Sequence, residues 1–526
     1  MALLRRWDVE SLGDSHGGET SASTYLQSIE RDLDRMPRRQ VLDFLVQYFL
    51  SELNWMKQVI HAPSFLAHVY AAQSLPSPSH TVDSIGGLSL TNIRNTCSEV
   101  SDSLAQACLS LDWKGSLVRV QDTLFLALKF SCEGRTDRFW EGIAAASRAA
   151  QKAGIHADAS FPSTNGAQNL EREIERRTLC SLYVLDSHLS RQLDRVPFLP
   201  DDLVSEALPQ LRLGLEISTD TSAPELFTER LMQVQLGQFW RSFGPRRNAE
   251  YDPLQSEQRY DRFCAEYLPA LPPTFALEPD TQWDTRLLKL PTQRQLLHIA
   301  IFDSICWNFR PLLLLKPAQI ARLAPYKQVL LQSQKRRLVL AALKKLEAVT
   351  ALHAKLGGSH TRFAVIIFNT FEAAVLLLGL CCHADFPFGH GEEDTMLLGV
   401  KAGRLTRRKD LQAAEQALRR LQMLADFSEM AASGERVVTQ LFIKASQEHA
   451  SEPVAQTGSS GSSAWPGSLL DSLGLDDNAG QWGFVEHANY GWLPESIPTM
   501  TQDDSYPVLQ GSRLGFAAPW AVDNSL

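Results

Sequence analysis

Apolar residues recur at helical spacing along most of the chain, and the first segment that shows this is Arg39–Ile60. Its apolar positions lie three or four residues apart, at Leu42, Leu45, Phe49, Leu53, Met56 and Ile60. This spacing predicts an amphipathic helix with a broad buried face. Pro63 lacks a backbone N–H and restricts the residue before it, so we expect the helix to stop near His61.

The same period predicts further helices over much of the remaining sequence. They are expected at Thr91–Leu111, Leu117–Cys132, Phe139–Ala153, Leu170–Leu193, Ala223–Phe243, Tyr260–Tyr267, Thr292–Leu314, Pro325–Leu356, His360–His383 and Arg407–Gln447. Gly154 is well placed to end one of them as a left-handed C-terminal cap. Few stretches alternate with period two and no repeat of fixed length is visible, so the pattern predicts an all-α, multi-helix bundle.

The longest apolar run is Phe363–Cys382, which is long enough to cross a bilayer. Asn369, Thr370 and Glu372 interrupt it, and an unpaired carboxylate in lipid is costly. We therefore interpret this run as a buried core helix and expect no membrane partner.

Composition divides the chain into three regions. Residues 1–24 are polar and rich in Ser and Gly, which predicts a disordered leader, and residues 25–450 carry the helical pattern. Residues 451–526 are rich in Ser, Gly, Pro and Asp, and predict a disordered tail. Aromatic residues are scattered among the acids of this tail, at Trp465, Trp482, Phe484, Tyr490, Trp492, Tyr506, Phe516 and Trp520. Such acidic-aromatic composition is typical of activation segments, the alternative being an inert linker.

Charge is concentrated in the same tail. Of the net charge of −9, nine acidic residues and one basic residue from Ser451 onward contribute −8, which leaves −1 for the rest of the chain. A nearly neutral body has no general attraction for nucleic-acid phosphate. Two basic clusters, Lys335–Arg337 and Arg404–Lys409, could serve nuclear import or touch phosphate, although a solvated helix face is the favoured interpretation for each.

The eight cysteines predict free thiols in a reducing compartment, since most lie in or beside apolar runs and only Cys381 and Cys382 are close together. No Cys-x-x-Cys occurs, so this stretch of chain cannot build a zinc cluster. Cys381, Cys382, His383 and His390 include metal-ligand types, but adjacent helical side chains diverge, which predicts no metal. The usual catalytic motifs are missing too, and we expect neither a cofactor nor an enzyme activity.

Three segments follow one another in a recognisable order. The first holds Asn54-Trp55, His61, Pro63 and Phe65; the second runs from Gly154-Ile155-His156 through Arg177, Asp186 and Arg195 to Pro209; the third ends on Arg310-Pro311. Together they resemble the fungal-specific transcription factor domain, the middle homology region of zinc-cluster regulators. The resemblance covers roughly residues 30–450. One departure is Asp194, which stands where the family has a glycine.

The resemblance singles out six signature positions of regulatory interest: Trp55, His61, Arg177, Asp186, Arg195 and Arg310. Arg177 and Asp186 could line a regulatory pocket, and Arg195 and Arg310 could grip an anionic effector with their planar guanidinium groups. The favoured alternative for all four is architectural: pairing between helices, or capping of helix ends.

The resemblance implies a nuclear transcriptional regulator of a metabolic or specialised-metabolite gene cluster. Its partners would be a coactivator and another transcription factor subunit, in a homo- or heterodimer, through which DNA is contacted indirectly. One alternative is a non-DNA-binding co-regulator that inhibits a zinc-cluster factor; removal of residues 451–526 should abolish output from an activator but leave an inhibitor repressing. A helical small-molecule-binding protein or enzyme is the third hypothesis.

Overall fold

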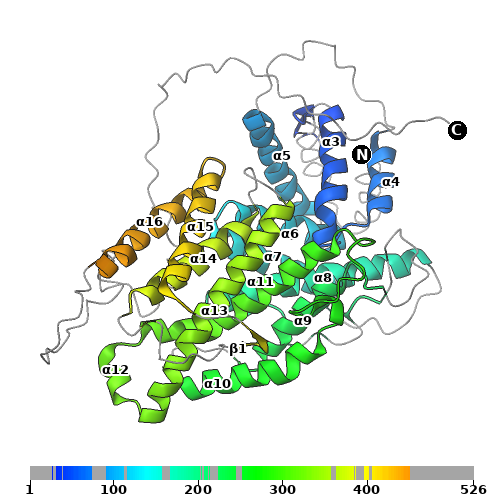
Figure 1. Ribbon diagram of the computed structural model, residues 1–526. Helices are drawn as coiled ribbons and strands as arrows, with labels where there is room; N and C mark the ends of the chain where they lie inside the picture. The colour runs from blue at the N-terminus through cyan, green and yellow to red at the C-terminus, as the bar shows by residue number, and fades with distance from the viewer. Residues whose placement is uncertain are drawn as a thin grey trace, which may run out of the picture. The chain divides into compact units, whose positions relative to one another are not determined.

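Helices joined by turns make up the computed structural model, as the spacing of apolar residues predicts (Figure 1). The structure describes residues 31–73, 90–111, 115–156, 166–213, 223–244, 251–356, 363–383 and 396–450, apart from short gaps within these stretches. The helices are α3 Arg39–Tyr48, α4 Ala62–Gln73, α5 Leu90–Leu111, α6 Leu117–Cys132, α7 Thr136–Lys152, α8 Gly166–Gln192, α9 Thr228–Arg241, α10 Pro253–Arg262, α11 Leu290–Phe309, α12 Pro317–Arg322, α13 Pro325–Leu356, α14 Ala364–Cys381, α15 Arg407–Ala425 and α16 Glu429–Ala450.

The all-α prediction is confirmed. The described residues add one short antiparallel hairpin, β1 Met396–Leu397 and β2 Val400–Lys401, which the sequence pattern did not indicate. The predicted leader, residues 1–24, and the predicted tail, residues 451–526, lie outside the described residues.

Local signals end several helices where they were expected. Gly154 follows α7 with φ +73°, the left-handed conformation that glycine adopts without a Cβ clash. The N–H of Ile155 donates to the Ala150 carbonyl at 3.1 Å, and the N–H of Gly154 donates to the Gln151 carbonyl at 3.2 Å. This is the Schellman arrangement, and it confirms the predicted cap.

The apolar run predicted as a core helix is α14, which packs against α13, α15 and α16 (Figure 1). Among the described helices it is the one that is long and apolar enough to cross a membrane, with a mean hydropathy of 2.1. The same window is 89% buried inside the protein, which supports the prediction of a core helix.

The predicted helix Arg39–Ile60 is wrong over its second half. The α-helix ends at Tyr48, a π-helical turn follows over Phe49–Leu53, and a 3₁₀ turn covers Asn54–Met56. The Asn54 side chain donates to the Ile60 carbonyl at 2.8 Å, and its oxygen accepts the Ile60 N–H at 3.4 Å. A side-chain amide that bonds nearby backbone competes with helical hydrogen bonds, so the chain turns here.

Two prolines open helices that the apolar spacing did not predict. Helical structure ends at Met56, before Pro63 as expected, and Pro63 itself lies in the first turn of α4. Pro317 opens α12 in the same way. A missing N–H is harmless in the first turn, since those groups have no intrahelical partner. The single helix predicted at Arg407–Gln447 is divided into α15 and α16 at residues 426–428, where the Ser428 hydroxyl accepts the Ala431 N–H at 3.4 Å.

In the N-terminal half, α6 packs on α7, and α8 packs on α7 and α9 around apolar residues such as Leu124, Ile143 and Tyr183. The α6–α7 contact is close because Gly142 faces Ala127. A Cβ at residue 142 would lie 2.8 Å from the Ala127 Cβ, which is too near for any real side chain.

We expect Gly142→Ala to lower the free energy of unfolding by about 1–3 kcal/mol, because overpacking forces α6 and α7 apart. The control is Gly379→Ala in α14, where an added Cβ meets nothing within 4 Å. That substitution should instead stabilise by about 0.5–1 kcal/mol, since alanine restricts the unfolded chain. Chemical denaturation of both variants tests this; equal effects would show that the α6–α7 contact is looser.

Candidate regulatory site

The first two signature residues shape the turn between α3 and α4. Trp55 is buried, and its indole N–H donates to the Glu52 carbonyl at 2.8 Å. His61 Nδ1 lies 2.8 Å from the Ser64 hydroxyl, at the start of α4. Burial lowers the pKa of His61, so the neutral ring is favoured in this position.

Arg177 is a buried connector on α8. Its Nε donates to Glu173 on the same helix at 2.9 Å, and its Nη2 donates to Glu225 at 2.6 Å. It also bonds Gln58, a non-glycine residue at φ +49° in the turn before α4. The guanidinium stacks 4.8 Å from the Phe227 ring centroid. Arg177 therefore ties α8 to the turn after α3 and to the segment before α9.

Asp186 is a second buried connector, nearer the C-terminal end of α8. Its carboxylate accepts the backbone N–H of Phe198 at 3.0 Å and of Leu199 at 2.9 Å, and pairs with Arg241 of α9 at 2.9 Å. Arg241 also donates to the Pro200 carbonyl at 2.8 Å. These bonds hold the irregular segment after α8 against both helices.

Arg195 lies just beyond the end of α8. Its N–H donates to the Ser190 carbonyl at 2.8 Å, and its guanidinium stands 5.3 Å from the Trp140 ring centroid. The preceding residue, Asp194, has φ +51°. Aspartate thus adopts the left-handed conformation at the position where the family has glycine, which it tolerates better than most residues do.

Arg310, the sixth signature residue, belongs to a buried ionic cluster. It donates to the Gln192 side chain of α8 at 2.8 Å and pairs with Glu372 of α14. Lys345 of α13 pairs with that same Glu372, and it pairs with Asp303 of α11 at 2.7 Å. Gln192 closes the network by donating to Asp303 at 2.9 Å. Four helices, α8, α11, α13 and α14, are joined by these five side chains.

Protonation in the cluster follows from burial and pairing. Burial alone would raise the pKa of Asp303, but Lys345 in particular holds it below its ordinary value. Burial would likewise lower the pKa of Lys345, and Asp303 followed by Glu372 holds it above its ordinary value. Burial raises the pKa of Glu372, and Lys345 offsets only some of this. Asp303 and Lys345 thus form the charged centre of the cluster.

The structure gives each of the six signature residues a protein contact and gathers four of them along α8 and its C-terminal end. None of the six lines the cavity found among the described residues. The observed bonds favour the architectural alternative, and a regulatory role for these positions stays a prediction. Sequence reasoning missed Gln192, Asp303 and Lys345; Glu372 left a signal, because it interrupts an otherwise apolar helix.

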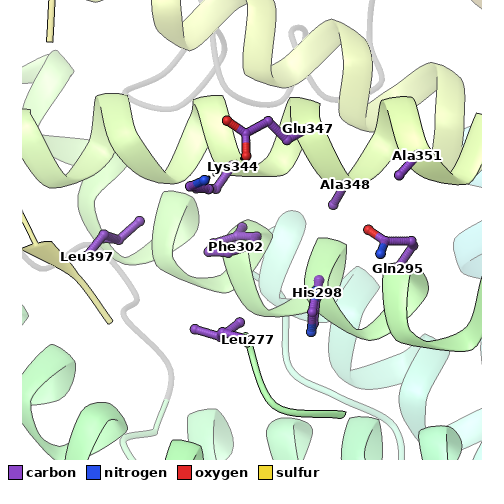
Figure 2. A pocket seen from close by; sticks show the side chains of 9 residues that line it. All are labelled: Leu277, Gln295, His298, Phe302, Lys344, Glu347, Ala348, Ala351 and Leu397. Atoms are coloured by element: carbon purple, nitrogen blue, oxygen red, sulfur yellow. Dashed lines mark hydrogen bonds and ion pairs between the residues drawn. The ribbon is translucent and has the colours of Figure 1, made fainter. Parts of the chain in front are cut away.

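A cavity of about 280 Å³ is lined mainly by α11 and α13 (Figure 2). Side chains from these two helices line most of it: Gln295, His298, Phe302, Lys344, Glu347, Ala348 and Ala351. Leu277 and Leu397 of β1 complete the lining. Phe302 and Lys344 directly precede Asp303 and Lys345, so neighbouring residues of α11 and α13 serve the cavity and the cluster.

The basic cluster Lys335–Arg337 is not the solvated face that we favoured from the sequence. Lys335 is buried, Arg337 pairs with Glu257, and the Arg337 guanidinium stacks 4.4 Å from the Tyr260 ring centroid. In the second cluster, Arg408 and Lys409 are exposed at the start of α15. No group of three or more metal-ligand side chains occurs within the described ranges, and His390 lies outside them.

Asp410, which the sequence did not single out, is fully buried in the first turn of α15. Within the portion of the chain that the structure describes, neither of its carboxylate oxygens has a hydrogen-bond partner. Burial raises the pKa of Asp410 from 3.8 to about 7, and Lys409 offsets only some of this. The side chain is therefore a buried acid that changes charge near neutral pH.

Comparison with known proteins agrees with the resemblance seen in the sequence. The sequence model for the fungal specific transcription factor domain matches residues 43–252. Transcription factor xilB of Penicillium rubens is 55% identical over 561 residues, which cover 99% of this chain and 83% of xilB. Probable transcription factor sol4 of Alternaria solani is 35% identical over 457 residues, covering 79% of this chain and 80% of sol4. No solved structure matches.

The chain belongs to the fungal-specific transcription factor domain family, and the protein is a transcriptional regulator. The region matched by the family model contains α8 and its bonds to the turn after α3 and to α9.

Removal of the cluster's central cation, Lys345, should strongly destabilise the folded protein. Lys345→Met should lower the free energy of unfolding by about 3–5 kcal/mol, because it leaves two buried carboxylates without their shared ammonium. Its neighbour is the control: Lys344 pairs with the exposed Glu347, so Lys344→Met should change stability by about 1 kcal/mol or less. Equal losses in chemical denaturation would contradict a central role for Lys345.

Asp410 makes stability depend on pH in a predictable direction. Since its folded pKa lies above the unfolded value, its stabilising effect is greatest below about pH 4 and is lost as the pH rises through 7. Between about pH 5 and 8, the unfolding free energy of the wild type should fall by about 2–3 kcal/mol more than that of the Asp410→Asn variant. The exposed Asp426 at the other end of α15 supplies the control, Asp426→Asn, which should keep the wild-type pH dependence.

Proposed function

We propose that this regulator acts in the nucleus on a fungal metabolic or specialised-metabolite gene cluster and reaches DNA through a partner subunit. The observation that carries the proposal is a combination of two facts. The chain resembles transcription factors over nearly its whole length, and yet its helical body is nearly neutral, which gives it no general attraction for DNA phosphate. The proposed function is not enzymatic.

Charge supports indirect DNA contact. Residues before Ser451 carry a net charge of only −1, which offers no general attraction for phosphate. Of the two basic clusters, Lys335–Arg337 is engaged in internal contacts. The exposed pair Arg408 and Lys409 is the surface that we propose for nuclear import, since an importing receptor needs accessible basic side chains.

The partner that we propose is another transcription factor subunit, in a homo- or heterodimer, bound to an apolar stripe on α3. Val41, Phe44, Leu45 and Tyr48 recur at helical spacing, and Phe44, Leu45 and Tyr48 are 67%, 42% and 50% exposed. Beyond the end of α3, Phe49 of the π-helical turn contacts Phe125 of α6 edge to face. Contiguous exposed apolar residues of this kind are typical of protein–protein contacts.

The acidic-aromatic tail would recruit a coactivator. Its acids keep the aromatic side chains solvated until they dock in an apolar groove of the partner. This element of the proposal depends on composition alone, because residues 451–526 lie outside the described structure.

The decisive experiment compares chromatin occupancy of the tagged full-length protein in its native host with binding of the purified protein to the same DNA sites. We expect occupancy in cells and no binding by the purified protein. Binding by the purified protein would overturn contact through a partner. A complete lack of nuclear occupancy would overturn the nuclear role.

A matched pair of variants tests the α3 stripe in the same assay. The double substitution Phe44→Ser and Tyr48→Ser should lower occupancy at least about tenfold, because central aromatic residues dominate such contacts. Val329→Ser removes another exposed apolar side chain, on α13 and away from the stripe, and should leave occupancy unchanged. Both proteins should melt like the wild type, so a loss confined to the α3 variant reports lost contact.

A further inference from the structure

The cavity between α11 and α13 combines an apolar body with one exposed ion pair. Figure 2 shows Lys344, Glu347, Ala348 and Ala351 along α13, facing Phe302, His298 and Gln295 of α11. Ala348 and Ala351 carry only methyl groups, which leaves room beside the Phe302 ring. The volume of about 280 Å³ is at the lower end for ligand sites and suits a molecule of roughly amino-acid size.

The charges that line the cavity cancel. Lys344 Nζ lies 2.7 Å from Glu347 Oε2, and these side chains are 29% and 59% exposed. His298 adds no charge: its Nε2 donates to the Ala276 carbonyl at 3.0 Å, and burial lowers its pKa, so the ring is neutral. A ligand with a single net charge would meet one attractive and one repulsive partner. A ligand that carries one charge of each sign would meet two attractive partners.

Two further features suit such a ligand. An exposed ion pair on a helix contributes little stability. Lys344 and Glu347 can therefore give up their mutual contact and each pair with a ligand charge, with little loss of stability. The Gln295 carboxamide lines the same cavity, and it makes no hydrogen bond within the described ranges. It can therefore donate to or accept from a ligand without giving up a protein contact.

We propose that this cavity binds a small zwitterion with an apolar body, of the size and charge of a hydrophobic α-amino acid. The ligand carboxylate would pair with Lys344 and its ammonium with Glu347. The apolar side chain would lie against Phe302, over the methyl groups of Ala348 and Ala351. This site is independent of the DNA contact proposed above, and it adds a ligand to the regulator.

Binding would act on the contact between α11 and α13. Lys344 and Phe302 of the cavity are followed directly by Lys345 and Asp303 of the ionic cluster, whose ammonium and carboxylate are 2.7 Å apart. A ligand that bridges α11 and α13 therefore stabilises the same helix pair that the cluster holds. The bound protein should unfold at a higher temperature, as linkage requires for a ligand of the folded state.

Three probes with one aromatic body test the site by calorimetric titration of the purified full-length protein. L-phenylalanine carries both charges, phenethylamine lacks the carboxylate, and 3-phenylpropionate lacks the ammonium. We expect L-phenylalanine to bind with a Kd of about 1 mM or lower, and each singly charged probe to bind at least about tenfold more weakly. Equal binding of all three, or no binding of L-phenylalanine at about 5 mM, would overturn the proposal.

Variants locate the binding. Ala348→Leu fills the cavity and should abolish binding, whereas Ala354→Leu, an exposed alanine on the same helix, should leave it intact. The double substitution Lys344→Gln and Glu347→Gln keeps the cavity open and should remove the preference for the zwitterion. If L-phenylalanine binds equally well to all of these variants, it binds elsewhere and the proposal fails. The titration needs neither DNA nor a nucleus, so its failure would leave the transcriptional role standing.

Discussion

The packing of this domain depends on how four helices share a small set of buried charges. Lys345 stands between Asp303 and Glu372, and Arg310 carries the network on to Gln192. A buried ion is tolerable only when its partners are in place, so α8, α11, α13 and α14 can approach one another in few arrangements. Apolar packing alone would allow helices such as α14 to rotate or slide, because α14 is buried on nearly all sides.

The residues of the family signature act on the same principle. Asp186 fastens α8 to irregular backbone, Arg177 fastens it to side chains of irregular segments, and Arg310 meets the end of α8 through Gln192. Irregular segments have backbone groups that no helix satisfies, and a buried side chain can satisfy several at once. Asp186 accepts hydrogen bonds from two backbone N–H groups and one guanidinium. This one carboxylate therefore satisfies backbone donors that a helix or sheet would otherwise satisfy.

The cavity lies beside the ionic cluster, so a ligand in the cavity would act on the same helices that the cluster joins. The two features share one helix pair: Phe302 and Lys344 line the cavity, and the next residues, Asp303 and Lys345, belong to the cluster. The apolar stripe on α3 lies in the other half of the domain, which joins this helix pair through α8. The two proposals thus assign partner contact to one half of the domain and ligand response to the other.

The sequence by itself determined the helical class, the family and the bounds of most helices, because helical periodicity and capping depend on residues within a few positions of one another. Leu117–Cys132 and Pro325–Leu356 were predicted to the residue, and Gly154 ended its helix as expected. Local reasoning failed where a side chain reached further along the backbone, as Asn54 does to Ile60. It also missed two helices, α4 and α12, that carry a proline in their first turn. Only the tertiary structure decided which charges are buried together. Arg310 and Gln192 lie 118 residues apart, and Lys344 and Lys345 are neighbours with opposite surroundings. No local pattern distinguishes these positions, since burial and partnership are properties of the packed helices.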